Sequence, residues 1–424
     1  MIGKEPRSDR DIITRQVRAL LDREAQIKTV ATVLDSHREE VREPDFGDFV
    51  RSPVTAVGQD GANILVVPGQ ILVHDEHADA AQAILGADFR REPIGCPELP
   101  VARFRSEVAD LAAANDALHD AGIPANFSHI TPSGPYIKGA GGAEIPNGTP
   151  VELKSEVGQG RIRVAIIDTG INMDDTEWPS LWLAGITQDR ANTDPLNAVS
   201  NGPLDHGGGH GTFVAGVVRQ VAPNAQIRVY RALDSDGIGS EEAVACAILR
   251  AVADGVDVIN LSLGTDTYKD RPPVALTAAL ELVPDEVVVV AAAGNDGSSR
   301  PNWPGAVKRV VAVGALDQDM TPAKWSNRGS WVDLSTVGEG IVSTFVSGYE
   351  TTAEDPEPED WRSDTTPWAM WTGTSFAAPQ ITGLIARDAE ASDARTALAN
   401  LRATGTHVAD WGIAIASPLK YSLV

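Results

Sequence analysis

The segment EVVVVAAAGN, residues 286–295, runs from a glutamate through seven consecutive Val and Ala residues to a glycine and an asparagine. A short apolar run without polar alternation is typical of a strand that is covered on both faces, as the strands of parallel sheets are. The same pattern recurs in RIRVAII (161–167), AQIRVYRAL (225–233), DVINLSL (257–263) and VKRVVAVGA (307–315). Helical stretches such as EEAVACAILRAVADG (241–255) and PPVALTAALELV (272–283) lie between these runs. The alternation predicts an α/β domain with a mainly parallel sheet and helices on both faces.

Composition and charge narrow the range of partners. The chain has 424 residues, of which 42% are hydrophobic, and this is enough for more than one compact domain. Its formal net charge of -24 argues against nucleic acid or an anionic membrane as the main partner, because phosphate groups would be repelled. The only two cysteines, Cys96 and Cys246, can form neither a disulfide framework nor a zinc cluster. We find neither a membrane-spanning run nor the apolar core of a secretory signal, so we expect a soluble, cytoplasmic protein.

Residues 1–50 are predicted to form an N-terminal amphipathic helix that extends from residue 9 to about residue 41. Ser8 and Asp11 are placed as a capping box at its start. Its apolar residues recur at three- and four-residue spacing: Ile13, Val17, Leu20, Leu21, Ile27, Val30 and Leu34. Either the rest of the chain or a regulatory partner protein could cover this stripe, and the sequence leaves both possibilities open.

Residues 55–131 have the pattern of a small α+β domain. Its strand-like segments are ANILVVPGQILV (62–73), ADFRREP (87–93), PVARFRSE (100–107) and ANFSHI (125–130), and its helical ones are DEHADAAQAIL (75–85) and VADLAAANDALHDAG (108–122). The order β-α-β-β-α-β predicts a ferredoxin-like unit with both helices on one face of the sheet. Residues 132–158 are rich in glycine and proline and are predicted to be a linker. The large α/β domain then occupies residues 159–424.

Polar residues follow the predicted strands of the large domain, where functional groups of open α/β sheets collect. Asp168 follows RVAII, His210 enters a helix from the stretch HGGGHGTFVAGVV, and Ser375 lies at a helix start in GTSFAAP. A serine hydroxyl needs an imidazole to accept its proton, and the imidazole needs a carboxylate to fix its tautomer. Asn295 adds a side-chain amide that can donate to the oxyanion formed during acyl transfer. These four residues together predict nucleophilic catalysis by Ser375.

Pro379 lies inside the helix that is predicted to begin near Ser375. Because proline has no N–H, it cannot donate to the Ser375 carbonyl four residues earlier. We therefore expect an irregular but fixed entry to this helix. The first turn of the helix also offers N–H groups and partial positive charge to an oxyanion.

The stretches DTGIN, HGTFVAG, AAAGN and GTSFAAP, in that order, resemble the motifs of the subtilisin-like serine peptidases. The resemblance covers nearly all of residues 160–424 and implies a three-layer α/β/α sandwich. It implies that Asp168 orients His210, which serves as general base and acid. It also implies that Ser375 attacks the substrate and that Asn295 donates to the oxyanion.

The resemblance implies an extended polypeptide substrate as well. Ser262-Leu263-Gly264 and Gly237-Ile238-Gly239 would flank it and hold it by backbone hydrogen bonds, and Gly294 lies beside the oxyanion donor. No cofactor is required. Calcium binds to many members of this family and a structural calcium is possible here, but the spacing of acidic residues does not locate its ligands.

Several residues depart from the family pattern or leave alternatives open. Phe213 replaces a histidine beside the predicted base, and Asn302 stands where the family often has a small residue at the floor of the first specificity pocket. Residues 347–367 are predicted to be a surface loop near the cleft. Asp296 is either a charge at the pocket rim that favours basic side chains or a solvated carboxylate. His206 is either half of a metal pair with His210 or part of a turn.

The small domain resembles the family's propeptide, an inhibitor whose C-terminal tail lies in the cleft. This resemblance rests on the order of elements, and it implies self-cleavage between residues 128 and 156. We expect a serine endopeptidase regulated by its N-terminal region. The alternatives are a latent protease fold that acts as a binding module under the control of a partner, and a hydrolase that has shifted to esters or to peptide ligation.

Overall fold

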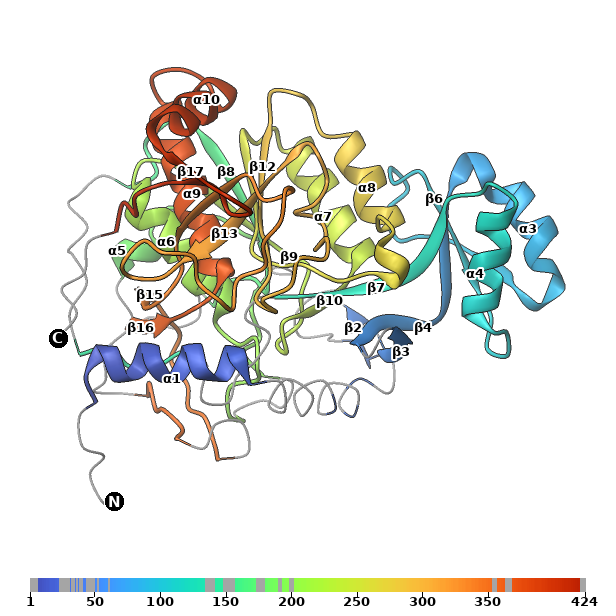
Figure 1. Cartoon of the computed structure of the whole chain (residues 1–424), viewed down its shortest axis with the longest axis horizontal. Helices are drawn as coiled ribbons and strands as arrows, with labels where there is room; N and C mark the ends of the chain where they lie inside the picture. Colours follow the sequence, from blue (N-terminus) through green and yellow to red (C-terminus); the bar gives the residue numbers. More distant parts are fainter. Residues whose placement is uncertain are drawn as a thin grey trace.

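The computed structural model describes residues 7–22, 31, 35, 37, 41–42, 50–51, 53–59, 62–133, 142–147, 157–172, 180–189, 193–197, 202–352, 357–362 and 368–419. A large α/β domain and a smaller α+β domain lie next to each other, and helix α1 lies against the large domain (Figure 1). Among these residues, no helix combines the length and the apolar composition that crossing a lipid bilayer requires.

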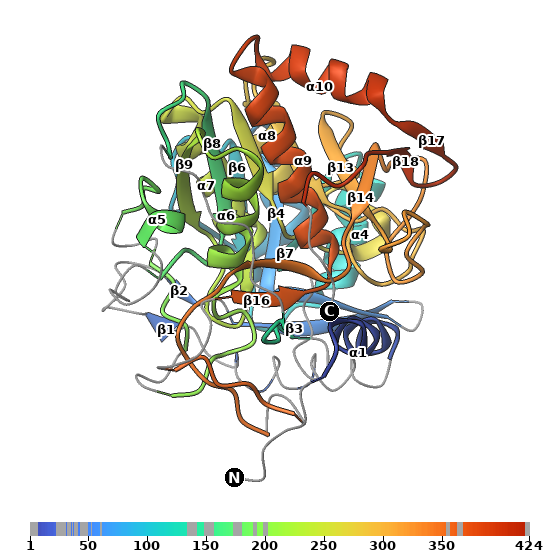
Figure 2. The ribbon, with the colours of Figure 1, turned by 90° about the vertical axis from the view of Figure 1, so that its left-hand side faces the viewer.

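The large domain is built on an eight-stranded sheet (Figure 2). The strand order is β17-β18-β14-β13-β12-β11-β8-β9, and only the pair β17–β18 is antiparallel. The strands are β8 Arg163–Asp168, β9 Gln226–Arg231, β11 Val258–Leu261, β12 Val288–Ala292, β13 Val310–Leu316, β14 Leu334–Val337, β17 Thr406–Val408 and β18 Gly412–Ala414. The predicted mainly parallel sheet is therefore confirmed.

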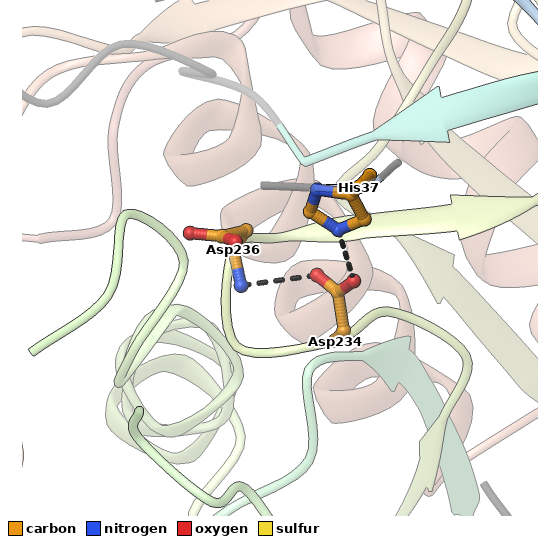
Figure 3. Close-up of side chains that lie close together, drawn as sticks. All are labelled: His37, Asp234 and Asp236. Atoms are coloured by element: carbon orange, nitrogen blue, oxygen red, sulfur yellow. Dashed lines mark hydrogen bonds and ion pairs between the residues drawn. The ribbon is translucent and has the colours of Figure 1, made fainter. Parts of the chain in front are cut away.

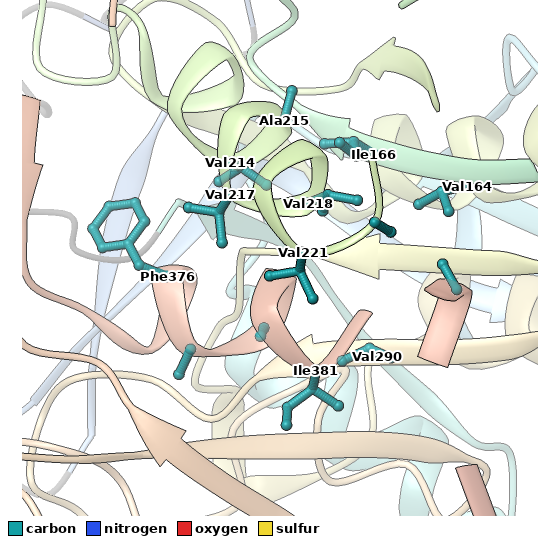
Figure 4. Close-up of a cluster of buried hydrophobic side chains, with 14 of the residues drawn as sticks. Val164, Ile166, Val214, Ala215, Val217, Val218, Val221, Val290, Phe376 and Ile381 are labelled. Carbon is teal, nitrogen blue, oxygen red and sulfur yellow. The ribbon is translucent and has the colours of Figure 1, made fainter. Parts of the chain in front are cut away.

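Helices cover both faces of this sheet. One face carries α6 His210–Val221, α9 Thr374–Ala389 and α10 Ala394–Thr404, and the other carries α7 Glu241–Ala253 and α8 Val274–Glu281. Alternate side chains of β8 enter different layers, because successive residues of a strand point to opposite faces. Val164 and Ile166 pack with α6 and α9 (Figure 4), whereas Ala165 and Ile167 pack with α7 and α8. Both faces are apolar and buried, which explains why the strands are continuous hydrophobic runs.

The small domain has the predicted order of elements. It contains β4 Ala62–His74, α3 Ala78–Leu85, β5 Arg90–Glu92, β6 Val101–Arg105, α4 Leu111–Asp120 and β7 Ala125–Pro132, with 3₁₀ turns at Asp75–His77 and Gly86–Asp88. The antiparallel order β7-β4-β6-β5 is that of a ferredoxin-like sheet, and α3 and α4 share one apolar core on one face. A further strand, β3 Thr55–Gln59, pairs with the start of β4 and was not predicted.

Gly69 allows β4 to continue past Pro68. Its φ is +74°, and a β-carbon there would lie 2.3 Å from the carbonyl oxygen of Ser106, so only glycine fits without a shift of backbone. The register of β4 against β7 shifts between Val66 and Ile71, as expected of a β-bulge at this point.

The open face of the small sheet packs on α7 and α8. Leu72 of β4 shares a core with these helices. Polar contacts cross the same interface: Arg103 Nη1 lies 3.1 Å from Glu242 Oε2, and His129 Nδ1 lies 3.1 Å from Glu241 Oε1. The two cysteines, distant in the sequence, also belong to this apolar cluster, Cys96 from the small domain and Cys246 from α7. The interface is thus apolar at its centre and closed by buried polar pairs.

Helix α1 spans Asp9–Leu21, with the predicted capping box of Ser8 and Asp11. Its buried face packs on the large domain, where Ile12 and Ile13 contact a cluster that includes Trp368 and Met370. The prediction of one continuous helix to about residue 41 is wrong at Asp22, which has an extended backbone with φ −87° and ψ 98°, although residues 31 and 35 are again helical. The apolar stripe stops at Leu21 and resumes only at Ile27. Since packing of an apolar face provides most helix stability in proteins, the helix ends where its stripe ends.

The remaining elements are short and lie mostly around the large domain. They are β1 Val41–Arg42 with β2 Val50–Arg51, α5 Ser180–Leu183, a 3₁₀ turn at Tyr268–Asp270, the strand β10 Ile238–Ser240, and the hairpin of β15 Ile341–Thr344 with β16 Trp368–Trp371. The predicted loop 347–367 is described at 347–352 and 357–362. It is not wholly a surface feature, because Trp361 is fully buried with its ring centroid 4.7 Å from that of Phe345.

Candidate active site

The predicted catalytic residues meet at one edge of the large sheet. Asp168 is the last residue of β8, His210 is the first of α6, Ser375 is the second of α9, and Asn295 lies three residues after β12. Because the parallel strands share a direction, their carboxyl ends bring these four segments together.

Asp168 and His210 are in direct contact. The distance from His210 Nδ1 to Asp168 Oδ1 is 2.7 Å, and both side chains are fully buried. A second contact fixes the carboxylate, since the Thr169 N–H donates to the same oxygen at 2.8 Å. A carboxylate at Nδ1 places the proton of the neutral ring on that nitrogen and leaves Nε2 free to accept a proton.

Ser375 lies next to this pair. The ring centroid of Phe376, the next residue in the chain, is 5.5 Å from that of His210, and the ring of Trp371 is edge-on to His210 at 5.6 Å. The Ser375 hydroxyl donates to the carbonyl of Ser262 at 2.9 Å. Aromatic packing therefore holds the imidazole beside the segment that carries the predicted nucleophile.

The Ser262 hydroxyl compensates for Pro379. It donates to the Ser375 carbonyl at 2.8 Å, and this is the carbonyl that would otherwise accept from the N–H that proline lacks. Pro379 lies inside α9, as predicted. A buried carbonyl without a partner would destabilise the helix, so Ser262 takes the place of one helical bond. The result is a two-way link between Ser262 and Ser375.

Asn295 is oriented by Thr374. The Thr374 N–H and hydroxyl both donate to Asn295 Oδ1 at 2.9 Å. Because the oxygen is used in this way, the NH₂ group of the amide must point in the opposite direction. This leaves a side-chain donor next to the first turn of α9, where the N–H of Ser375 offers a second one.

The two predicted substrate strands lie on either side of the chain's own residues 130–133. Strand β10, which contains Ile238 and Gly239, pairs antiparallel with the end of β7. The Ser133 N–H donates to the Gly237 carbonyl at 2.7 Å, and the Gly264 N–H donates to the Pro132 carbonyl at 3.1 Å. Ser133 also forms an antiparallel bridge with Leu263. The end of β7 thus adds a strand between the two predicted binding segments.

Comparison with known proteins identifies the family. A family model described as "Subtilase family" matches residues 159–414, which is more than half of the chain. The chain belongs to the subtilase family.

Individual relatives of this subtilase match over the large domain. A thermophilic serine proteinase of Bacillus sp. (strain AK1) is 34% identical over 233 residues, which are 53% of this chain and 51% of the relative. Thermitase of Thermoactinomyces vulgaris is 31% identical over 263 residues, covering 58% of this chain and 84% of the relative. The chain thus spans about half the length of the first of these relatives.

Among solved structures, fervidolysin from Fervidobacterium pennivorans, described as a keratinolytic enzyme related to subtilisin, superposes with a TM-score of 0.60. The match covers 87% of this chain and 63% of fervidolysin at 20% sequence identity. This likeness supports the fold. The three-layer sandwich is therefore confirmed for this subtilase.

Asn302, predicted at the floor of the first specificity pocket, lies between Gly264 and Gly294, two predicted substrate-binding residues whose segments we call the walls of this pocket. A β-carbon on Gly264 would lie 2.0 Å from Asn302 Oδ1, and one on Gly294 would lie 3.2 Å from Asn302 Cγ. The absence of side chains at these two glycines is what makes room for the larger residue. The structure thus places Asn302 against both wall segments.

Asp194 is a positioning residue that sequence reasoning missed. It is fully buried, and its carboxylate accepts from the Gly209 N–H, the Thr169 hydroxyl and the Leu196 N–H, each at 2.9 Å. Thr169 in turn accepts from the Gly211 N–H at 3.0 Å. Burial raises the pKa of Asp194 to about 6. The residue therefore ties down both neighbours of His210, and a single aspartate in an irregular stretch gave no sequence signal for this role.

Two departures from the family pattern have structural explanations. Phe213 is fully buried, with its ring centroid 4.5 Å from that of Phe376, so it packs beside the base without replacing any catalytic group. His206 Nδ1 lies 3.5 Å from Asp236 Oδ1, whereas His210 Nδ1 lies 2.7 Å from Asp168 Oδ1.

One group of side chains has the spacing of metal ligands. Among the described residues, ligand atoms of His37, Asp234 and Asp236 lie within 4.8 Å of one another (Figure 3). His37 Nε2 lies 2.7 Å from Asp234 Oδ2, while Asp234 Oδ1 accepts from the N–H groups of Asp236 and Ile238. Both Asp234 oxygens thus stabilise the loop before β10. A nitrogen ligand also fits calcium poorly, so the predicted calcium remains without a located site.

Proposed function

We propose that this subtilase is a serine endopeptidase in which Asp168, His210, Ser375 and Asn295 perform the chemistry. The 2.7 Å contact between His210 and Asp168, at the helix start that faces the Ser375 segment, is the observation that carries the proposal. Relatives named as serine proteinases support the same activity. A polypeptide substrate follows from the backbone pairing that Gly237 and Gly264 already make with a strand of this chain.

Each residue has a defined step in this mechanism. His210 Nε2 accepts the proton of the Ser375 hydroxyl while Ser375 Oγ attacks the substrate carbonyl carbon. The Asp168 carboxylate accepts a hydrogen bond from His210 Nδ1–H and stabilises the imidazolium that forms. The Asn295 amide and the Ser375 N–H donate to the oxyanion. His210 then returns the proton to the leaving amine, and water repeats the sequence on the acyl-enzyme.

We further propose that the N-terminal region inhibits the enzyme by occupying its cleft. Residues 130–133 use the same backbone groups that an extended substrate would need. The small domain then fixes this segment through Arg103 and His129, which pair with the first residues of α7. A substrate can bind only after β7 is displaced or after the chain is cleaved between residues 128 and 156. Residues 134–141 and 148–156 of that range lie outside the described part of the chain.

A latent binding module is the second candidate, and the complete burial of Ser375 is the observation that favours it. A fluorophosphonate probe separates the two functions. An enzyme is labelled at Ser375 once the N-terminal region is released, whereas the Ser375→Ala variant stays unlabelled. A chain that remains unlabelled after its N-terminal region has been removed, while still folded by circular dichroism, would refute the peptidase.

Intact mass tests the inhibitory segment. On incubation we expect the wild-type chain to be converted to two fragments, with the cut between residues 128 and 156, and the Ser375→Ala chain to keep its full mass. Equal full-length masses for both chains would refute self-cleavage. A cytoplasmic location is also proposed, supported by a relative named intracellular serine protease in Paenibacillus polymyxa at 29% identity. Cell fractionation checks it.

A further inference from the structure

Two carboxylates lie beside the wall segments of the first specificity pocket. Asp266 comes two residues after Gly264, and Asp296 directly follows the oxyanion donor Asn295. Asn302 connects to the first of them, since its Nδ2 donates to Asp266 Oδ1 at 3.2 Å. Each wall segment therefore has an acidic residue two positions after its glycine: Asp266 after Gly264, and Asp296 after Gly294.

Asn302 adds a third acceptor. Its side chain is only 4% exposed, and its Oδ1 has no hydrogen-bond partner among the described residues. Because Nδ2 is used by Asp266, the orphan oxygen is directed to the region between Gly264 and Gly294. A buried carbonyl oxygen without a donor is costly unless a ligand supplies one. This oxygen requires a donor from whatever enters the pocket.

The local charge points to the same kind of ligand. Burial raises the pKa of Asp266. Asp296 is exposed to solvent. The one cation that acts on Asp266, Arg300, has its own ion pair with Asp270 at 2.7 Å. The two carboxylates thus repel each other, and the cation near Asp266 also binds Asp270.

The position of the catalytic groups indicates which substrate side chain enters this pocket. Ser262 accepts from the Ser375 hydroxyl, and Asn295 donates to the oxyanion, so both flank the carbonyl under attack. The residue whose carbonyl is attacked, P1, therefore directs its side chain between the segments that follow Ser262 and precede Asn295. Asp266 follows the first of these segments, Asn302 lies beside the glycine of each, and Asp296 comes directly after Asn295.

We propose that the enzyme selects peptides with lysine or arginine at P1, with the side-chain cation bound by Asp266 and Asp296 and hydrogen-bonded to Asn302 Oδ1. This inference rests on the peptidase function proposed above. A cationic side chain relieves the repulsion between the two carboxylates and supplies the donor that Asn302 lacks. An apolar P1 side chain would leave all three acceptors unsatisfied.

The test uses internally quenched peptides that differ only at P1, with Arg, Lys, Gln, Leu and Phe, and the active protein released from its own N-terminal region. We expect kcat/KM for Arg or Lys to exceed that for Leu by at least about 10-fold, since hydrogen bonds to charged groups contribute about 1.5–3 kcal/mol. Turnover of Leu or Phe peptides at equal or higher kcat/KM would overturn the specificity and leave the peptidase intact. Turnover of no peptide would instead count against the proposed function.

Matched variants locate the selectivity. Asp296→Asn and Asp266→Asn should each lower kcat/KM for Arg peptides about 10-fold while the value for Leu peptides changes less than about 2-fold. Asp296→Glu should keep the preference for basic residues and shows that the site tolerates substitution. Asp319→Asn removes the same charge from an exposed loop away from the pocket and should have no effect.

Two further readouts are specific to the charge. The preference for Arg should fall as the pH is lowered, because Asp266, whose pKa is raised by burial, then becomes protonated. Added calcium at millimolar concentration should compete with Arg peptides more than with Leu peptides. Selectivity that is unchanged in both Asn variants, or a site that responds to calcium while showing no preference for basic P1 residues, would refute the assignment.

Discussion

Helix α1 holds the segment that leads into the nucleophile, and Gln16 makes three hydrogen bonds to the rest of the chain. Its Nε2 donates to the carbonyls of Gly142 and Met370 at 2.8 and 2.9 Å, and its Oε1 accepts from the Thr372 hydroxyl at 2.7 Å. Gln16 is fully buried. Thr372 also accepts from the Gly340 N–H, so the contact continues into the hairpin beside α9. Gln16→Met keeps the length of the side chain and removes all three hydrogen bonds.

The expected cost follows from these contacts. Each intramolecular hydrogen bond contributes about 0.5–1.5 kcal/mol net, so the three together give roughly 2–4 kcal/mol. At roughly 2–4 °C per kcal/mol for a domain of this size, the melting temperature should fall by at least about 4 °C.

The measurement is a thermal melt in the Ser375→Ala background, which prevents self-digestion. Arg10→Met places the same residue on the exposed face of the same helix and should change the melting temperature by less than about 1 °C, as surface substitutions usually do. Equal melting temperatures for the two variants would show that α1 is not docked through Gln16.

Three further predictions concern the site and its inhibition. Asn295→Ala should lower kcat about 10²–10³-fold with little change in KM, a magnitude already known for the oxyanion donor of this enzyme family, and an unchanged kcat in peptide hydrolysis would contradict its role. Arg103→Ala should weaken docking of the small domain by about 1–2 kcal/mol, because the partly exposed ion pair of Arg103 with Glu242 is lost, and the initial peptidase rate should rise severalfold. Arg91→Ala, on the outer side of that domain, should leave this rate unchanged. The pKa of Asp194 is raised from 3.8 to about 6, so its contribution to stability is present below about pH 4 and lost as the pH rises through 6. Relative to Asp194→Asn, the wild type should therefore lose about 3 kcal/mol of unfolding free energy between pH 4 and pH 7, and a constant difference in denaturant titrations would refute this.

Local patterns account for what the sequence predicted correctly. The run in residues 286–295 gives a buried strand because an unbroken apolar segment needs cover on both faces. Asp168, His210 and Ser375 each stand at a strand end or a helix start, and parallel strands bring such positions to one edge of a sheet. Even the missing bond at Pro379 could be anticipated, since it is a property of one residue and its neighbour four positions earlier.

The length of the N-terminal helix was not predictable in this way. The apolar spacing of residues 13–34 looks continuous at helical periodicity, yet α1 ends at Leu21. What decides its end is the surface against which it packs, and that surface is formed by segments that lie far away in the sequence, such as those of Trp325 and Trp368. Propensity is a weak guide when tertiary contacts supply most of the stability.

The sequence by itself determined the layered α/β architecture and the candidates for the reacting groups, because strand periodicity, helix starts and the four motifs are all encoded locally. Only the tertiary structure decided that Ser133 lies between Gly237 and Leu263, that Asp194 holds both neighbours of His210, and that Asn302 meets Asp266. In each case the partners come from loops that have no periodicity. Their meeting depends on how separate strands end at a common edge, and no pattern within a single segment records it.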